Sequence, residues 1–304
     1  MGITSTTATS RSRIKELAKA VHDEIYSIEN TLKRRGYEYA GSGSIDNLVI
    51  PKDMSSLKVD GFYKHMGSRT FRNIVKDIVA KKENILPDDY INGCSETKLS
   101  EYFDFLCSAG IIQYAANSSS YYLTIRINDF GPTLEWYVSE LFKRELECTA
   151  DWGVRIKHFK PGGDFDVIAR DESKLVWIET KSSRPEDISE TDIRHFLQRD
   201  QNLDPDMSIF LVDTRDDLSS LVDYFKTIIT PILEPKRYAS DPHFRTKIEQ
   251  LPDFGGIHFF QRRIFITNSQ PSILTKLRHC LRYYFAVVPQ LTYFSRERRL
   301  DFLT

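Results

Sequence analysis

Residues 162–183 read GGDFDVIARDESKLVWIETKSS, and this stretch decides the fold that we expect for the second half of the chain. It holds two β-rich runs, DFDVIAR (164–170) and KLVWIETKSS (174–183), joined by a short polar segment. A third run, WGVRIKHF (152–159), precedes them across a Pro-Gly-Gly turn. Tight turns between runs rich in β-branched and aromatic residues are typical of antiparallel strands. The stretch therefore predicts an antiparallel meander of three strands.

Charged side chains stand at matching ends of the last two predicted strands. Because side chains alternate between the faces of a strand, Asp164 and Asp166 share one face, as do Glu179 and Lys181. In a hairpin these groups converge at one end of the sheet. An apolar Val-Trp-Ile run leads straight into Glu179, and strand interiors rarely carry charge without a functional reason.

Two carboxylates beside one ammonium group suit the hydrolysis of a phosphodiester. That reaction requires charge to be neutralised on the phosphate and a water molecule to be activated, and hard divalent cations with oxygen ligands do both. We expect Asp166 and Glu179 to hold Mg²⁺ or Mn²⁺, with the backbone carbonyl of Thr180 as a third ligand. Lys181 would orient the attacking water or stabilise the developing negative charge.

The arrangement resembles the PD-(D/E)xK nuclease superfamily, which has the restriction-endonuclease-like fold. Residues 131–215 follow the order of elements in that family: a helix with a glutamate, a strand, an Asp strand, a (D/E)-x-K strand and a helix. The resemblance implies that Asp166, Glu179 and Lys181 are the catalytic residues. It also implies that Glu135, in GPTLE, is a further metal or water ligand, and that Gln198 on the following helix supports the site.

One departure from the family pattern leaves an alternative open. The Pro-Asp pair is absent, and Gly163-Asp164-Phe165-Asp166 stands in its place, so Asp164 competes for the metal role. We prefer Asp166 because the family aspartate is usually followed by an apolar strand, as in DVIA.

The remaining pattern predicts an α/β fold with a mixed central sheet flanked by helices over residues 131–304. SIFLVDT (208–214) is continuously apolar, as expected for a strand covered on both faces. Ser189 with Asp192 predicts a capped helix, LSSLVDYFKTIITPIL reads as another, and a last helix is expected at about 272–286. IHFFQRRIFITNS is β-rich. Strands alternating with helices favour the α/β class.

Residues 41–130 resemble a winged-helix module. Ser68 is positioned to cap a helix, a short helix is expected after Pro87, and Ser95 opens a third helix that a β-hairpin follows. The third helix carries one lysine against three acidic residues, which makes it a poor partner for phosphates. Reading of DNA by this module and protein docking or simple packing both remain open.

The first 40 residues predict an N-terminal helix over residues 11–35, with its apolar residues spaced by three and four. This seam is either the packed face of a helix in its own domain or a dimerisation face. Its members are Ile14, Ala18, Val21, Ile25, Ile28 and Leu32.

Charge and cysteine usage limit the classes of protein further. The formal net charge is −1, from 42 basic and 43 acidic residues, so a surface for nucleic acid has to be local. A candidate is the basic and aromatic C-terminal region with Arg262, Arg263, Arg278 and Arg282, although a solvated charged helix explains it equally well. The four cysteines lack metal-binding spacing and are expected to be reduced.

These features together predict a cytoplasmic, Mg²⁺-dependent endonuclease that cuts DNA rather than RNA, in defence, restriction or repair. We expect no membrane association, because neither a signal-peptide pattern nor an apolar run of membrane-spanning length is present. A homodimer or a regulatory protein partner is also expected. The alternative is a non-catalytic protein that binds nucleic acid or docks a partner and carries a nuclease-like domain.

Overall fold

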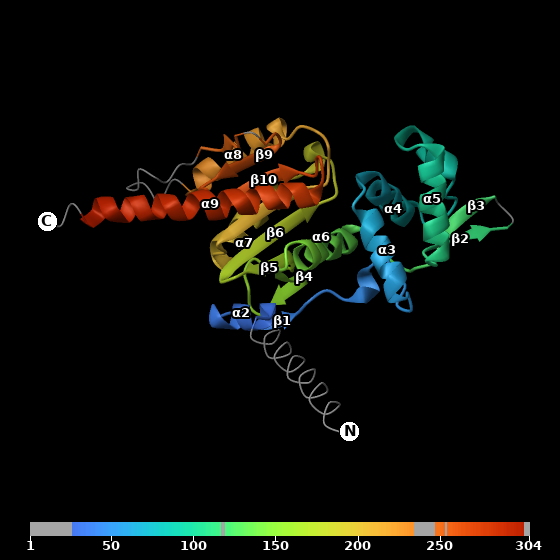
Figure 1. Cartoon of the computed structure of the whole chain (residues 1–304), viewed down its shortest axis with the longest axis horizontal. Helices are drawn as coiled ribbons and strands as arrows, with labels where there is room; N and C mark the ends of the chain where they lie inside the picture. The colour runs from blue at the N-terminus through green and yellow to red at the C-terminus, as the bar shows by residue number, and fades with distance from the viewer. Residues whose placement is uncertain (1–25, 117–118, 234–246, 253, 301–304) are drawn as a thin grey trace, which may run out of the picture.

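A mixed eight-stranded sheet with helices on both faces forms the centre of the computed structural model (Figure 1). The structure describes residues 26–116, 119–233, 247–252 and 254–300. Strand order in the sheet is β1-β4-β5-β6-β7-β10-β9-β8. The strands are β1 (Tyr39–Gly41), β4 (Thr149–Ile156), β5 (Phe165–Asp171), β6 (Lys174–Lys181), β7 (Met207–Val212), β8 (Glu249–Gln250), β9 (Ile257–Phe260) and β10 (Ile264–Asn268).

The predicted meander is confirmed, because β4, β5 and β6 pair consecutively as antiparallel strands. Strand β7 runs parallel to both of its neighbours, β6 and β10, and every one of its residues is buried. This arrangement confirms the expectation for residues 208–214, since parallel strands occur where helices cover both faces. The mixed α/β class is thereby established.

Two separate apolar layers cover the sheet. One face packs against α2 (Ile28–Arg34), α7 (Glu190–Leu203) and α8 (Ser219–Leu233). The other face packs against α6 (Gly131–Glu145) and α9 (Ile273–Leu300), and its core continues into the N-terminal helices. The alternation of β6 divides its apolar residues between the layers, with Val176 and Ile178 in one and Leu175 and Trp177 in the other.

The helical part before the sheet domain has the element order expected of a winged helix. Its elements are α3 (Ser56–Met66), α4 (Arg69–Lys81), the 3₁₀ segment η2 (Pro87–Gly93), α5 (Glu96–Ser108), β2 (Ile112–Ala115) and β3 (Ser120–Leu123). Ile85, between α4 and η2, bridges to Tyr121 and so extends the β2–β3 hairpin. Helix α3 was not expected from the sequence. Figure 1 shows α5 and the hairpin farther from the large sheet than α3 and α4.

Helix caps agree with the sequence at two of three positions. Ser189 and Asp192 form a complete capping box at α7, and Ser95 accepts a hydrogen bond from the backbone of Lys98 at α5. Ser68 stands at the N-cap of α4 but makes no capping hydrogen bond. Its hydroxyl instead accepts a hydrogen bond from Tyr102 at 2.9 Å, so tertiary contact replaces the local cap.

The segment before α3 belongs in space to the large sheet. Strand β1 pairs with β4, and Ile28 and Leu32 of α2 are buried in the same apolar layer as α7. These two members of the predicted seam therefore pack within their own chain. The other four, Ile14, Ala18, Val21 and Ile25, lie outside the described residues.

A buried ion pair joins the helical part to the sheet. Arg72 of α4 donates two hydrogen bonds, both of 2.7 Å, to the carboxylate of Asp213, which directly follows β7. The two side chains are 2% and 3% exposed. A third hydrogen bond, from Arg72 to the carbonyl of Met66, measures 2.6 Å. The pair satisfies both charges, and this is the condition for burying them.

Two further expectations concern membrane helices and disulfides. Across the described ranges, no helix combines the length and the apolar character that crossing a membrane requires. All four cysteines are free thiols in the structure.

Candidate active site

Strands β5 and β6 separate at the point where their acidic residues stand. Backbone pairing between them ends at Val167 and Ile178. Beyond that pair, the Asp166 carboxylate accepts hydrogen bonds from the backbone nitrogen of Thr180 at 2.7 Å and from its hydroxyl at 3.1 Å. Asp166 thus takes the place of a backbone partner and is fixed beside the Glu-Thr-Lys segment.

Glu179 and Lys181 form the second half of the cluster. The Lys181 ammonium lies 3.1 Å from Glu179 Oε1 and 2.9 Å from Asp192 Oδ1 of α7. Burial alone lowers the pKa of Lys181, but Glu179 and Asp192 outweigh this and raise it above its usual value. Glu179 is 6% exposed, and within the described part of the chain its Oε2 atom has no hydrogen-bond partner. A buried carboxylate oxygen without a hydrogen bond is uncommon and is suited to bind a cation.

Carboxylates in this cluster crowd one another. Burial, and then the charge of Glu179, raise the pKa of Asp166 well above its usual value, although the hydrogen bonds from Thr180 oppose this. Burial together with Asp166, Asp164 and Glu179 raises the pKa of Glu135 to about 10. Glu135 is the fifth residue of α6, and its Oε2 lies 3.8 Å from the position that a Cβ on Gly153 would take. Like charges brought together out of water produce such shifts, and a bound cation would reverse them.

The two candidate aspartates differ in their surroundings. Asp164 is exposed, whereas Asp166 is partly buried and hydrogen-bonded to the segment that carries Glu179 and Lys181. The geometry therefore favours Asp166 over Asp164 as the aspartate of the cluster.

Helix α7 contributes a different residue from the one that the resemblance implied. Gln198 is exposed, and its neighbour Arg199 turns toward the site, with Nη1 3.8 Å from Glu179 Oε2. Arg199 also donates to the carbonyls of Gly162 at 2.8 Å and Asp164 at 2.9 Å. It therefore ties the loop before β5 to the cluster.

Gly163 is required by this contact. Its φ is +104°, and a Cβ placed there would lie 2.1 Å from Arg199 Nη2. Sequence reasoning missed Arg199, although Asp192, Phe196 and Arg199 recur at spacings of four and three and so share one helix face.

The arginines proposed for nucleic acid do not gather at this site. Arg262 and Arg263 precede β10, at the end of the parallel strands opposite to Lys181. Arg263 is bound by Asp200 through hydrogen bonds of 2.8 and 2.7 Å. Arg278 and Arg282 lie on α9, and Arg278 contacts Glu145 of α6.

The cluster offers two carboxylates to a cation, and not three. Within the described ranges, no three His, Cys, Asp or Glu side chains are gathered closely enough to bind a metal ion. Glu135 is therefore not a third ligand in this arrangement. Mg²⁺ is typically held by one or two carboxylates and completes its shell with water and substrate phosphate. The pair Asp166 and Glu179, with the unsatisfied Glu179 Oε2, fits that kind of site.

Comparisons with known proteins find only remote likenesses. No protein-family model matches the sequence, and no curated protein is significantly similar to it. Among solved structures, protein VC1899 from Vibrio cholerae is similar over 61% of this chain and 52% of that chain, with a TM-score of 0.39 and 16% identity. Can2 from Sulfobacillus thermosulfidooxidans, solved with cyclic tetra-adenylate, is similar over 65% of this chain and 54% of that chain, with a TM-score of 0.42 and 15% identity. The chain thus spans about half the length of each, and the case for an activity rests on the site itself.

Proposed function

We propose that the chain is a metal-dependent nuclease that hydrolyses phosphodiester bonds, with DNA as the expected substrate and a restriction-endonuclease-like core around β4 to β7. One observation carries the proposal. Asp166 and Glu179 are brought together where β5 and β6 separate, with Lys181 against Glu179 and one buried carboxylate oxygen unsatisfied. This combination is costly for folding, and a divalent cation with an anionic substrate would make use of it.

Asp166 and Glu179 would hold Mg²⁺ or Mn²⁺, with the Thr180 carbonyl as a candidate third ligand. When bound, the ion supplies charge neutralisation and activation of water. Lys181 orients the attacking water or stabilises negative charge on the phosphate, because its ammonium is held between Glu179 and Asp192. Its raised pKa keeps it charged at neutral pH.

Arg199 and Glu135 act through other groups. Arg199 positions the loop before β5 and lies beside Glu179, so it is a positioning residue. Glu135 adds negative charge behind Asp166, which strengthens the attraction of the cluster for a cation once the protons have left.

The deciding experiment is a cleavage assay on labelled single-stranded, double-stranded and branched DNA and on RNA, with Mg²⁺, Mn²⁺ or EDTA. Asp166→Asn and Lys181→Ala should each reduce metal-dependent cleavage by at least about 10²-fold, as expected when a group that stabilises transition-state charge is removed. Lys174→Ala, at the other end of the same strand, is the matched control and should leave the rate within about twofold.

Two results would contradict the proposal. Equal cleavage by the wild type and Lys181→Ala would show that the activity comes from elsewhere. Absence of cleavage of every substrate under all metal conditions would favour the alternative, a non-catalytic protein that binds nucleic acid or docks a partner.

A further inference from the structure

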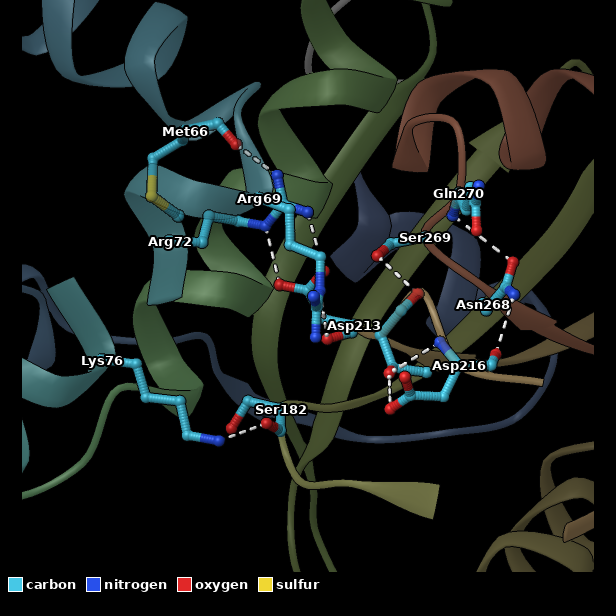
Figure 2. A network of polar contacts seen from close by, with 11 residues as sticks. Met66, Arg69, Arg72, Lys76, Ser182, Asp213, Asp216, Asn268, Ser269 and Gln270 are labelled. Atoms are coloured by element: carbon cyan, nitrogen blue, oxygen red, sulfur yellow. Dashed lines mark hydrogen bonds and ion pairs between the residues drawn. The ribbon is translucent and has the colours of Figure 1, made fainter. Parts of the chain in front are cut away.

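A cleft of about 320 Å³ lies between α4 and the ends of β6 and β7. Its α4 wall contains Arg69, Asn73 and Lys76, and its other wall is formed by residues 182–184 after β6 and residues 213–214 after β7. Figure 2 shows Lys76 reaching Ser182 and the arginines of α4 reaching Asp213 across this junction. The cleft is thus built from both halves of the chain.

Helix α4 presents opposite faces to the core and to the cleft. Its apolar residues are buried, while Arg69, Asn73 and Lys76 recur at spacings of four and three along the side that lines the cleft. Arg69 is 25% exposed and Asn73 is exposed. Polar and cationic groups on successive turns of a rigid helix suit an extended anionic ligand.

The negative charges in the wall are already compensated. Asp213 is held by two hydrogen bonds from the buried Arg72, while Arg69 Nε donates to the Asp213 backbone carbonyl at 3.3 Å and lies 4.0 Å from its carboxylate. Asp77, on the rim, is paired with Lys81 at 2.9 Å. These pairs leave the cations of the cleft available to a ligand.

Lys76 and Arg184, two cations that line the cleft, have few or weak interactions with carboxylates. The Lys76 ammonium donates to the backbone carbonyl of Ser182, and among the described side chains it has no carboxylate at ion-pair distance. Arg184 is 69% exposed, and its ion-pair partners among the described residues are Glu186 and Asp187, each at 3.2 Å. Exposed pairs of this kind contribute little, so a phosphate competes with them readily.

The cleft begins one residue beyond the candidate catalytic lysine. Ser182 follows Lys181 directly, and the backbone nitrogen of Asp213 donates to the Lys181 carbonyl at 2.8 Å. Arg72 fixes Asp213 from α4. The position of the cleft relative to Lys181 is therefore set by a chain of buried hydrogen bonds.

We propose that this cleft binds a backbone phosphate of the substrate nucleic acid, next to the phosphodiester that is cut, through Arg69, Lys76 and Arg184. The proposal rests on the nuclease function proposed above. It assigns the delivery of substrate to α4, the helix that lies against the sheet, and not to the acidic α5 that the winged-helix pattern points to. Phosphate contacts of this kind position a duplex or strand without reading its sequence.

Binding, measured apart from cleavage, tests the proposal. Fluorescence anisotropy of labelled oligonucleotides, single-stranded and double-stranded, is recorded in Mg²⁺ with the full chain carrying Lys181→Ala. Adding Lys76→Gln and Arg184→Gln should weaken binding by about tenfold and lower the slope of log K against log salt by about 1 to 2. The control, Lys33→Gln with Lys226→Gln, removes two charges from α2 and α8 on the other face of the sheet and should change binding by less than about twofold.

Arg184→Gln alone keeps the test valid if Lys76→Gln destabilises the chain, because the Arg184 side chain is exposed and should account for a slope change of about 1. Unchanged binding in the cleft variants, an equal loss in the control, or absence of binding by either oligonucleotide overturns the proposal. The two proposals fail separately. Cleavage that depends on Asp166, together with unchanged binding in the cleft variants, removes only the cleft, whereas binding that depends on the cleft without any cleavage removes only the catalysis.

Discussion

Two clusters of buried charge lie at the C-terminal ends of the neighbouring strands β6 and β7, and they differ in how their charges are balanced. At the end of β7, Asp213 is matched by Arg72 with two short hydrogen bonds. At the end of β6, Glu179 shares its surroundings with Asp166, and among the described residues its Oε2 has no hydrogen bond and only a long contact, of 3.8 Å, with Arg199. Lys181 and Val212 are register partners, so the two clusters lie at the same level along their strands.

The pKa directions express this difference. Burial raises the pKa of both aspartates, but hydrogen bonds and charge from Arg72 reverse the shift at Asp213 and bring it below its usual value. At Asp166 the next largest influence is Glu179, which raises the pKa further. In the cluster at Asp213, the positive charge of Arg72 compensates the buried carboxylate and joins two parts of the fold. In the cluster at Asp166, neighbouring carboxylates raise the pKa further, and strongly shifted pKa values are frequent at functional sites.

The largest expected effect tests the balanced cluster. Arg72→Met should lower the free energy of unfolding by about 3 to 5 kcal/mol, because it leaves the buried Asp213 carboxylate without its partner. Urea unfolding followed by circular dichroism measures this. Replacing both partners, Arg72→Met with Asp213→Leu, should recover most of the loss. A double variant as unstable as the single one would contradict the role of unpaired charge.

A change of opposite sign is expected in the imbalanced cluster. Asp166→Asn should raise the free energy of unfolding in EDTA by about 1 to 2 kcal/mol, because it removes one of two crowded carboxylates while an oxygen remains to accept from Thr180. The same variant should lose cleavage. Thermal unfolding with and without Mg²⁺ provides the measurement, and a destabilised Asp166→Asn would argue against crowding.

Glu135 predicts how the stability of the metal-free protein depends on pH. Its pKa in the folded state is about 10, far above that of an unfolded glutamate at about 4.3. The folded state therefore holds this proton more tightly, and the contribution to stability that is present at low pH is lost as pH rises across that window. In EDTA, Glu135→Gln should flatten the decline, so that its stability relative to wild type rises by up to about 1.4 kcal/mol per pH unit across that window. Parallel pH curves for the two proteins would refute the assignment.

The smallest effect is expected at Asp192, which holds Lys181 from α7. Asp192→Asn keeps a side-chain oxygen for the capping box but removes the charge beside the ammonium. Stability should change by less than about 1 kcal/mol, since the residue is partly exposed. Cleavage should fall by about threefold to tenfold, with the loss in kcat more than in KM. A loss confined to KM would indicate a role in binding.

Local pattern was enough to predict the elements that form the site. Alternation and turn residues predicted the β4–β5–β6 meander, and the unbroken apolar run predicted the buried β7. Helix α3 was missed, because its apolar residues do not all fall on one face: only Phe62 and Met66 are buried, and Leu57 is exposed. Caps were predicted where the bond is local, as at Ser189, and not where a distant hydroxyl competes, as at Ser68.

The candidate site was predictable to the extent that it lies on one hairpin. Asp166, Glu179 and Lys181 are brought together by neighbouring strands, and alternation places them without knowledge of the rest. Arg199 and Asp192 approach from a helix, so their contacts depend on how α7 packs on the sheet. Gln198 differs from Arg199 by one position, a rotation of about 100° on a helix, and the spacing from Asp192 through Phe196 places Arg199, not Gln198, on their face.

The sequence by itself determined the strand order of the meander and the convergence of Asp166, Glu179 and Lys181, because each depends on contacts between near neighbours along the chain. It also determined that β7 is buried, because the apolar run is continuous, but not which strands pair with it. Tertiary structure alone decided that α4 rather than α5 lies against the sheet, that Arg72 neutralises Asp213, and that Arg262 and Arg263 stand at the far end of the strands. Those features join residues that are far apart in sequence. These residues come close together because the helices and strands bury their apolar faces against one another. That packing also fixes where the charged side chains of the same elements lie.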